Sequence, residues 1–170
     1  MTPTTHIATA CLLTTLIVKS GTEGLPAVLV VTGGSLLLHL AFDMIPHGYI
    51  TTPHTIFRKI VPTVIELFPG PLILLASIRL MGNPVLFIMA SIFGLLPDFA
   101  TTLYCRDMEK AAKIPLVLPL HRLHRKIHWF ETELPDGEIS FLFPNRPLLA
   151  FEAVCVFCIL TVLFKGTLRI

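Results

Sequence analysis

The feature that most constrains the fold is a series of long apolar runs separated by shorter polar stretches. The clearest run covers residues 25–45, and a helix needs about 20 residues to cross a bilayer. Hydrophobic residues make up 54% of the chain and charged residues only 14%, which is too apolar for an ordinary soluble domain. The sequence therefore predicts an all-α, polytopic membrane helix bundle of four or five transmembrane helices. We expect it to form one integral membrane domain over residues 1–170.

Five apolar runs are expected to supply the helices of this bundle: 6–18, 25–45, 60–80, 84–104 and 147–164. The first run is short for a span, so the sequence leaves open whether it crosses the membrane. Pro69-Gly70-Pro71 interrupts the third run, which predicts a broken or kinked helix there. A polar, histidine-rich loop is expected over 105–146.

Lysine and arginine residues indicate the orientation, since short loops rich in them face the cytoplasm. Most of them lie in 105–146 and in the loop after the second run, so both loops are expected to be cytoplasmic. The net charge of +2 is too small to favour a nucleic-acid partner. Membrane lipid is the expected contact of the basic residues, and the candidate metal ligands described next all fall on this same membrane face.

Three candidate ligands follow one another at intervals of four residues at the end of the second run. His39 and Asp43 lie on one face of a helix, and His47 continues the row just past the break at Pro46. A charged side chain at membrane depth costs roughly 3 kcal/mol or more unless it is paired, so it marks a functional site. We interpret this stretch as half of a metal site.

A second group of histidines lies in the 105–146 loop. Spacings of three and four place His121, His124 and His128 on one stripe of a helix, which can close on a metal held by His39 and Asp43. Imidazole and carboxylate ligands with an open position suit zinc, manganese or iron better than copper. The expected cofactor is a divalent metal ion, with zinc first.

Basic residues are interleaved with these histidines. In one interpretation Arg122, Arg125 and Lys126 belong to an interfacial helix that contacts anionic lipid headgroups. In the other, Arg122 or Arg125 binds the anionic group of a phosphorylated substrate beside the metal. The two interpretations are compatible.

Three further residues are candidates with open alternatives. His6, at the start of the first run, is either a metal ligand or a polar residue at the membrane interface. Asp98, which follows Pro97 in the fourth run, is either a ligand or a helix-end carboxylate. Glu66 is either a general base or a partner of backbone groups freed by the prolines of the third run.

Three short motifs give the chain a family resemblance. Thr5-His6, Leu96-Pro97-Asp98 and a His-Arg box beginning at His121 resemble the bacterial membrane-bound, metal-dependent hydrolases, also called LexA-binding, inner-membrane-associated hydrolases. The resemblance implies a multi-spanning bacterial inner-membrane protein with a divalent-metal site. Ala100 stands where that family usually has a second acidic residue, and Arg125-Lys126-Ile127-His128 matches the continuation of the box only in part.

These features favour a metal-dependent hydrolase at the cytoplasmic membrane face, acting on a phosphoester or lipid-linked substrate. In such an enzyme the metal lowers the pKa of a bound water towards about 7. One alternative is a membrane di-iron oxidoreductase of the desaturase or hydroxylase type, for which the seven histidines of the chain are few. Another is a non-enzymatic metal-binding membrane protein or a transporter, whose ligands would lie near the bilayer midplane on broken helices.

Overall fold

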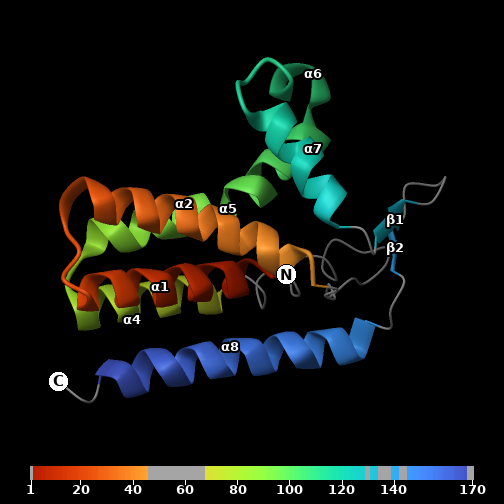
Figure 1. Cartoon of the computed structure of the whole chain (residues 1–170). Helices are drawn as coiled ribbons and strands as arrows, with labels where there is room; N and C mark the ends of the chain where they lie inside the picture. The colour runs from red at the N-terminus through yellow and green to blue at the C-terminus, as the bar shows by residue number, and fades with distance from the viewer. Residues whose placement is uncertain (1, 46–67, 129–130, 134–138, 142–144, 168–170) are drawn as a thin grey trace.

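The computed structural model describes residues 2–45, 68–128, 131–133, 139–141 and 145–167. Helices dominate this part of the chain, which confirms the prediction of a helical fold (Figure 1). The helices are α1 (Pro3–Lys19), α2 (Gly24–Asp43), α4 (Pro69–Met81), α5 (Pro84–Arg106), α6 (Met108–Ala111), α7 (Val117–Ile127) and α8 (Asn145–Thr167). Two short strands, β1 (Glu131–Glu133) and β2 (Ile139–Phe141), pair antiparallel with Thr132 opposite Ser140.

Two of the described helices, α2 and α5, are long and apolar enough to cross a membrane, whereas four or five spans were expected. The difference has a physical basis in the other helices of the predicted bundle. Helix α1 has 17 residues and is rich in threonine, and α4 has 13 residues because it begins only at Pro69. The proline-rich interruption of the third run therefore forms the first turn of α4, where proline is well tolerated.

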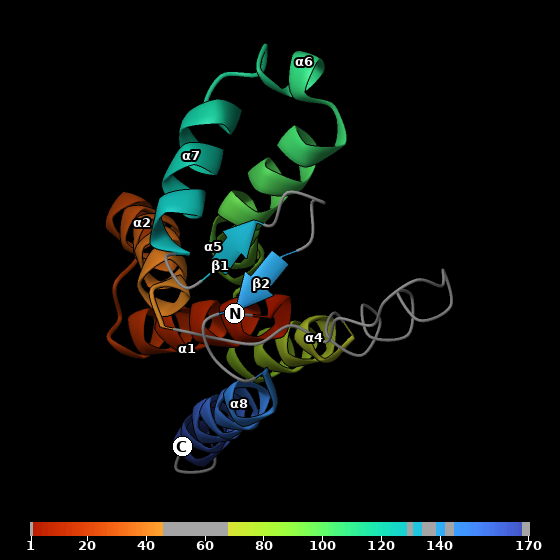
Figure 2. The same ribbon diagram turned by 90° about the vertical axis from the view of Figure 1, so that its right-hand side faces the viewer.

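Helix α1 occupies the centre of the helical layer and contacts α2, α4, α5 and α8 (Figures 1 and 2). Its threonines are suited to this buried position because their hydroxyl groups form hydrogen bonds with backbone carbonyls of the same helix. Thr14 donates to the carbonyl oxygen of Ala10 at 2.8 Å, and Thr15 donates to that of Cys11 at 2.9 Å. A buried hydroxyl that bonds to the preceding turn does not need a partner on a neighbouring helix.

Glycines let three helices approach α1 closely. A Cβ atom added to Gly34 of α2 would lie 2.7 Å from Leu13 Cδ2, and one added to Gly70 of α4 would lie 2.6 Å from Ile7 Cδ1. At Gly94 of α5 the nearest side-chain atom is the Cβ of Ala10, at 3.5 Å. Small residues at helix contacts are typical of membrane bundles, where association depends on close packing.

The segment 105–146, predicted to be a loop, contains α6, α7 and the strand pair. Helix α5 continues past Pro97 to Arg106, so Asp98 lies within a helix and does not cap its end. Beyond this proline α5 turns towards α6, and α7 then returns to pack against α5 and to contact α2 (Figure 1). This return brings the histidines of α7 to the end of α2.

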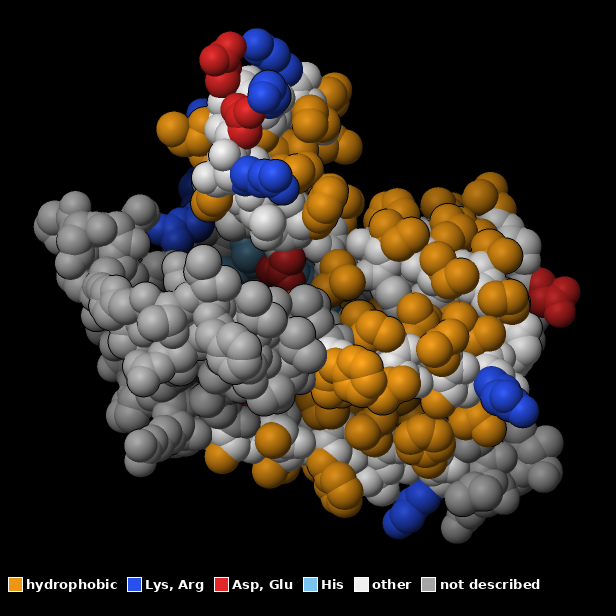
Figure 3. Space-filling view, turned by 180° about the vertical axis from the view of Figure 1, so that it is seen from behind, with side chains coloured by type: hydrophobic (Ala, Val, Ile, Leu, Met, Phe, Trp, Pro, Cys, Tyr) orange, Lys and Arg blue, Asp and Glu red, His pale blue; other side chains and the backbone are white. Residues whose placement is uncertain are grey.

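Apolar side chains cover a broad area of the surface of the helical layer (Figure 3). They include Leu25, Leu29 and Leu37 on α2 and Val85 and Ile92 on α5, with Leu37 67% exposed. Monomeric soluble proteins rarely expose apolar patches of this kind. The surface therefore agrees with the finding that α2 and α5 could cross a membrane.

Candidate metal centre

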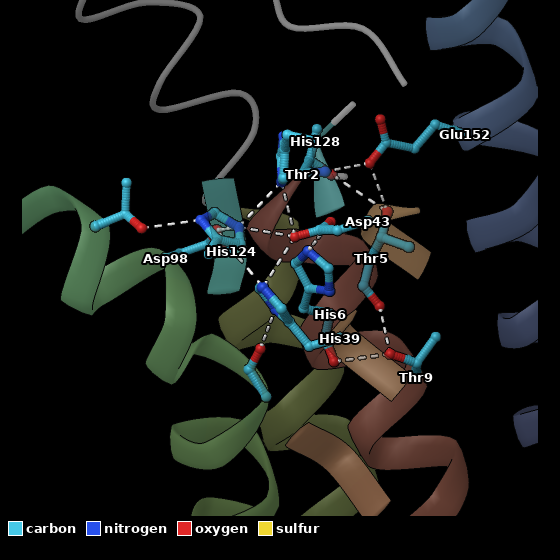
Figure 4. Close-up of polar contacts among 12 residues, drawn as sticks. Thr2, Thr5, His6, Thr9, His39, Asp43, Asp98, His124, His128 and Glu152 are labelled. Carbon is cyan, nitrogen blue, oxygen red and sulfur yellow. Dashed lines mark hydrogen bonds and ion pairs between the residues drawn. The ribbon is translucent and has the colours of Figure 1, made fainter. Parts of the chain in front are cut away.

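Imidazole and carboxylate groups from four helices converge at the end of α2 (Figure 4). Five of the six side chains come from α1, α2, α5 and α7, and the sixth belongs to the residue directly after α7. The six residues are His6, His39, Asp43, Asp98, His124 and His128. The spacing of four residues places His39 and Asp43 on one face of α2. His124 lies on α7, and His128, four residues on, directly follows the end of that helix. These predicted pairs therefore face each other across the centre.

Asp43 lies in the middle of this cluster, with its side chain 1% exposed. Its Oδ2 atom lies 2.9 Å from His39 Nε2, 2.9 Å from His124 Nε2 and 3.1 Å from His128 Nε2. Its Oδ1 atom lies 3.1 Å from His6 Nε2. One carboxylate is thus surrounded by four imidazole nitrogens.

Four of these residues could hold a metal ion. Ligand atoms of His39, Asp43, Asp98 and His124 all lie within 4.8 Å of one another. Asp98 Oδ1 lies 3.2 Å from His124 Nε2 and 3.8 Å from His39 Nε2. Tetrahedral zinc with bonds of about 2.1 Å separates its ligand atoms by about 3.4 Å, so these spacings suit such an ion.

The second ring nitrogens of two of these histidines have contacts that hold the rings in place. His39 Nδ1 lies 2.6 Å from the carbonyl oxygen of Gly94, which can only accept, so Nδ1 carries the proton. With Nδ1 donating to Gly94, the Nε2 atom, 2.9 Å from Asp43 Oδ2, is the ring nitrogen left to bind a metal ion. His124 Nδ1 similarly lies 2.9 Å from Thr101 Oγ1. Such outer partners are typical of metal-bound histidines.

The charge of His124 follows from its neighbours. Burial disfavours the imidazolium form, but hydrogen bonds with Asp43 and Asp98 outweigh burial and raise the pKa of His124 to about 9. In the metal-free protein this ring therefore holds a proton at neutral pH. A metal ion bound at the same place would displace that proton, because imidazole coordinates metals in its neutral form.

The other predicted residues of α7 lie around this cluster. The His121 ring stacks on Tyr104, with ring centroids 4.2 Å apart, and its Nδ1 lies 3.4 Å from Thr101 Oγ1. His121 therefore contacts α5 and is not among the four residues whose ligand atoms converge. Arg122 is exposed and Arg125 is half-buried.

Two predicted residues, His47 and Glu66, lie outside the described residues. A carboxylate that the sequence analysis did not single out is buried beside α1. Glu152 of α8 accepts hydrogen bonds from Thr5 Oγ1, at 2.7 Å, and from the backbone N–H of Thr2 (Figure 4). The sequence did contain a sign of this residue's role. Glu152 is a charged residue inside an apolar run, and burying such a charge costs free energy unless it is paired. Because Thr5 immediately precedes His6, Glu152 fixes the end of α1 that carries this histidine.

Replacing Thr101 with Val tests whether the outer partner of His124 matters. We expect the metal affinity to fall by roughly 10- to 100-fold, because the His124 ring loses the group that orients it. Titration of the purified protein with zinc measures the affinity. The matched control is Thr161→Val on α8, where the hydroxyl donates to the carbonyl oxygen of Phe157 on an exposed face. Equal affinities for the two variants would show that Thr101 does not orient His124.

No protein-family model, curated protein or solved structure matches the chain. The class of protein is therefore defined by its fold and its donor groups. It is a helical protein with two helices that could cross a membrane and a buried histidine and aspartate cluster that could hold a metal ion.

Proposed function

We propose that the protein is a membrane-embedded, metal-dependent hydrolase whose metal is held by His39, Asp43, Asp98 and His124. The observation that carries this proposal is the convergence of these ligand atoms in a site that is closed on all but one side. The Asp98 side chain is 30% exposed, whereas those of the other three ligands are nearly inaccessible. Catalytic zinc sites hold the metal with three protein ligands and keep the fourth position for water or substrate, so Asp98, on the exposed side, is the ligand that water would replace. Zinc is the first candidate ion, and manganese or iron would suit the same ligands.

The residues around the centre have roles that follow from their chemistry. When bound, the metal would supply a Lewis acid and an activated water. The substrate would approach the metal from the exposed side of the centre, where Asp98 lies. Arg125 follows His124 on α7 and, with Arg122, would bind an anionic phosphoryl group. His128 Nε2 lies 3.0 Å from His124 Nε2 and is placed to accept a proton beside the metal ligands.

An apolar hollow on α5 favours a lipid-linked substrate. It has a volume of about 290 Å³ and is lined by Ile92, Leu95, Leu96 and Phe99. Leu95 lies one helical turn before Asp98, so the hollow adjoins the exposed side of the centre. Figure 3 shows histidine and acidic side chains in a recess with apolar side chains on one side of it. A substrate with a phosphoester at the metal and a hydrocarbon chain along α5 would fit this arrangement.

The same features support a proposal for the location of the centre. The helices that could cross a membrane expose leucines, whereas α6 and the turn after it expose Lys110 and Lys113. Basic segments next to membrane spans face the cytoplasm. We therefore place the centre at the cytoplasmic face of a membrane, which the family resemblance would make the bacterial inner membrane.

The test is hydrolysis by the detergent-purified protein after removal of metal with a chelator and reloading with zinc, manganese or iron. Two substrates are used: a water-soluble chromogenic phosphodiester and phospholipid vesicles. We expect cleavage of at least one substrate by the reloaded protein and none by the metal-free protein or by His39→Ala. A protein that binds metal but cleaves neither substrate would refute the hydrolase proposal and favour a non-enzymatic role.

A further inference from the structure

We propose that the centre holds a second metal ion, on the Oδ1 side of Asp43, bound by that oxygen and by His6. The inference rests on the metal site of the proposed function and adds an ion to it. It starts from a surplus of donors. Six residues converge, whereas a single zinc ion is usually bound by three or four protein ligands. Two buried imidazoles, those of His6 and His128, remain once the first four ligands are assigned.

Of the two remaining imidazoles, His6 has the fewer hydrogen-bond partners among the described residues. Its side chain is 0% exposed, and neither of its ring nitrogens forms a hydrogen bond within the described residues. Leaving one buried polar group unsatisfied costs about 1–3 kcal/mol. The Nε2 atom nevertheless lies 3.1 Å from Asp43 Oδ1 and so points into the centre. An ion between these two atoms would satisfy the nitrogen.

The Asp43 carboxylate has the arrangement of a bridging ligand. Its Oδ2 atom faces the nitrogens of His39, His124 and His128, whereas its Oδ1 atom faces His6. A carboxylate whose two oxygens face different donors can bind one ion through each oxygen. In two-metal enzyme sites the ions lie about 3.5–4 Å apart, a distance that such a bridge spans.

Contacts outside the centre hold His6 in this position. Glu152 of α8 binds Thr5, the residue before His6, and the His6 ring lies against that of His39 with centroids 3.8 Å apart. A Cβ atom added to Gly94 of α5 would lie 3.5 Å from the carbonyl oxygen of His6, so these helices are in close contact at this level. Three neighbouring helices therefore fix the start of α1 with its imidazole towards Asp43.

A second ion would narrow the substrate class to phosphoesters. Two-metal sites clamp the attacking and leaving oxygens of an in-line displacement at phosphorus. In that reaction a water oxygen bonds to phosphorus as the bond from phosphorus to the leaving alcohol oxygen breaks. One proton of the water finally resides on the alcohol, so no further reactant is needed. An imidazole not occupied by metal can carry the proton between them.

The experiment measures zinc per chain at saturation, by elemental analysis of the full-length protein in detergent. We expect two equivalents in the wild type and one in His6→Ala. The matched control is His121→Ala, which removes an imidazole stacked on Tyr104 and should leave two equivalents. One equivalent in the wild type, or two in His6→Ala, would overturn the second site and leave the proposed hydrolase intact. A wild type that binds no zinc would refute both.

A spectroscopic measurement on the wild type keeps the inference testable if His6→Ala does not fold. The protein is loaded with manganese at one and then two equivalents, and electron paramagnetic resonance spectra are recorded. Ions that share the Asp43 carboxylate should give an exchange-coupled signal that appears with the second equivalent. Two magnetically isolated ions would contradict a bridge at Asp43.

Discussion

Replacing Asp43 with Asn is expected to lower zinc affinity by about 10³-fold or more. This exceeds the roughly 10- to 100-fold loss typical of removing an outer partner, because Asp43 is itself in contact with four imidazoles. The amide has nearly the same size but no charge, and its nitrogen cannot serve as a ligand. Hydrolysis should be lost in parallel with the metal. Elemental analysis and zinc titration measure the first effect, and the phosphodiester assay measures the second.

The matched control for this variant is Asp107→Asn. Asp107 is half-exposed and pairs with Lys110 at 2.9 Å, away from the centre, so its metal content should match that of the wild type. Circular dichroism establishes that both variants keep their helices. If Asp43→Asn binds zinc as tightly as Asp107→Asn does, the ion does not sit where the four imidazoles converge.

Replacing Phe87 with Ala is expected to destabilise the protein by about 3–5 kcal/mol, the usual cost of removing a buried phenyl ring. Phe87 of α5 is fully buried in a core shared with Ile7 and Cys11 of α1, Ile73 of α4 and Ile159 of α8. A cavity at this place removes contacts with three neighbouring helices at once. Denaturant titration in mild detergent, followed by circular dichroism, measures the free energy of unfolding.

Phe157→Ala on α8 is the control, because the Phe157 side chain is 71% exposed. Exposed substitutions usually change stability by about 0.5 kcal/mol or less. Equal unfolding free energies for the two variants would mean that the helices do not share the core around Phe87. A loss in Phe87→Ala alone would support the central position of α1.

Local spacing predicted which residues close in sequence contribute to the centre together. His39 with Asp43, and His124 with His128, needed only the helical period to be placed on common faces. The same period also placed His121 on that stripe, but the structure turns this ring towards Tyr104. Spacing shows which residues share a helix face and does not show which member of a row reaches a partner on another helix.

Contacts between distant helices could not be predicted from a single sequence. The outer partners Gly94 and Thr101 are ordinary residues of an apolar helix, and only the docking of α2 and α7 gives them a role. Glu152 was recognisable as a costly charge, but its partner Thr5 lies at the other end of the described chain. The continuation of α5 beyond Pro97 could not be predicted either, because proline usually ends a helix.

The central position of α1 has a consequence for how the protein is made. Helix α1 precedes in the chain every helix that later encloses it, and its core contacts extend to Ile159 and Leu163 of α8. During synthesis α1 is made before its neighbouring helices. Its threonine hydroxyls do not need partners on those helices, because they donate to backbone carbonyls of α1 itself. The centre draws on residues from His6 to His128, so a nascent chain that does not yet include α7 and His128 lacks part of the cluster. If the centre binds metal as we propose, loading would be a late step of assembly, because an ion supplied early would meet only His39 and Asp43 on α2.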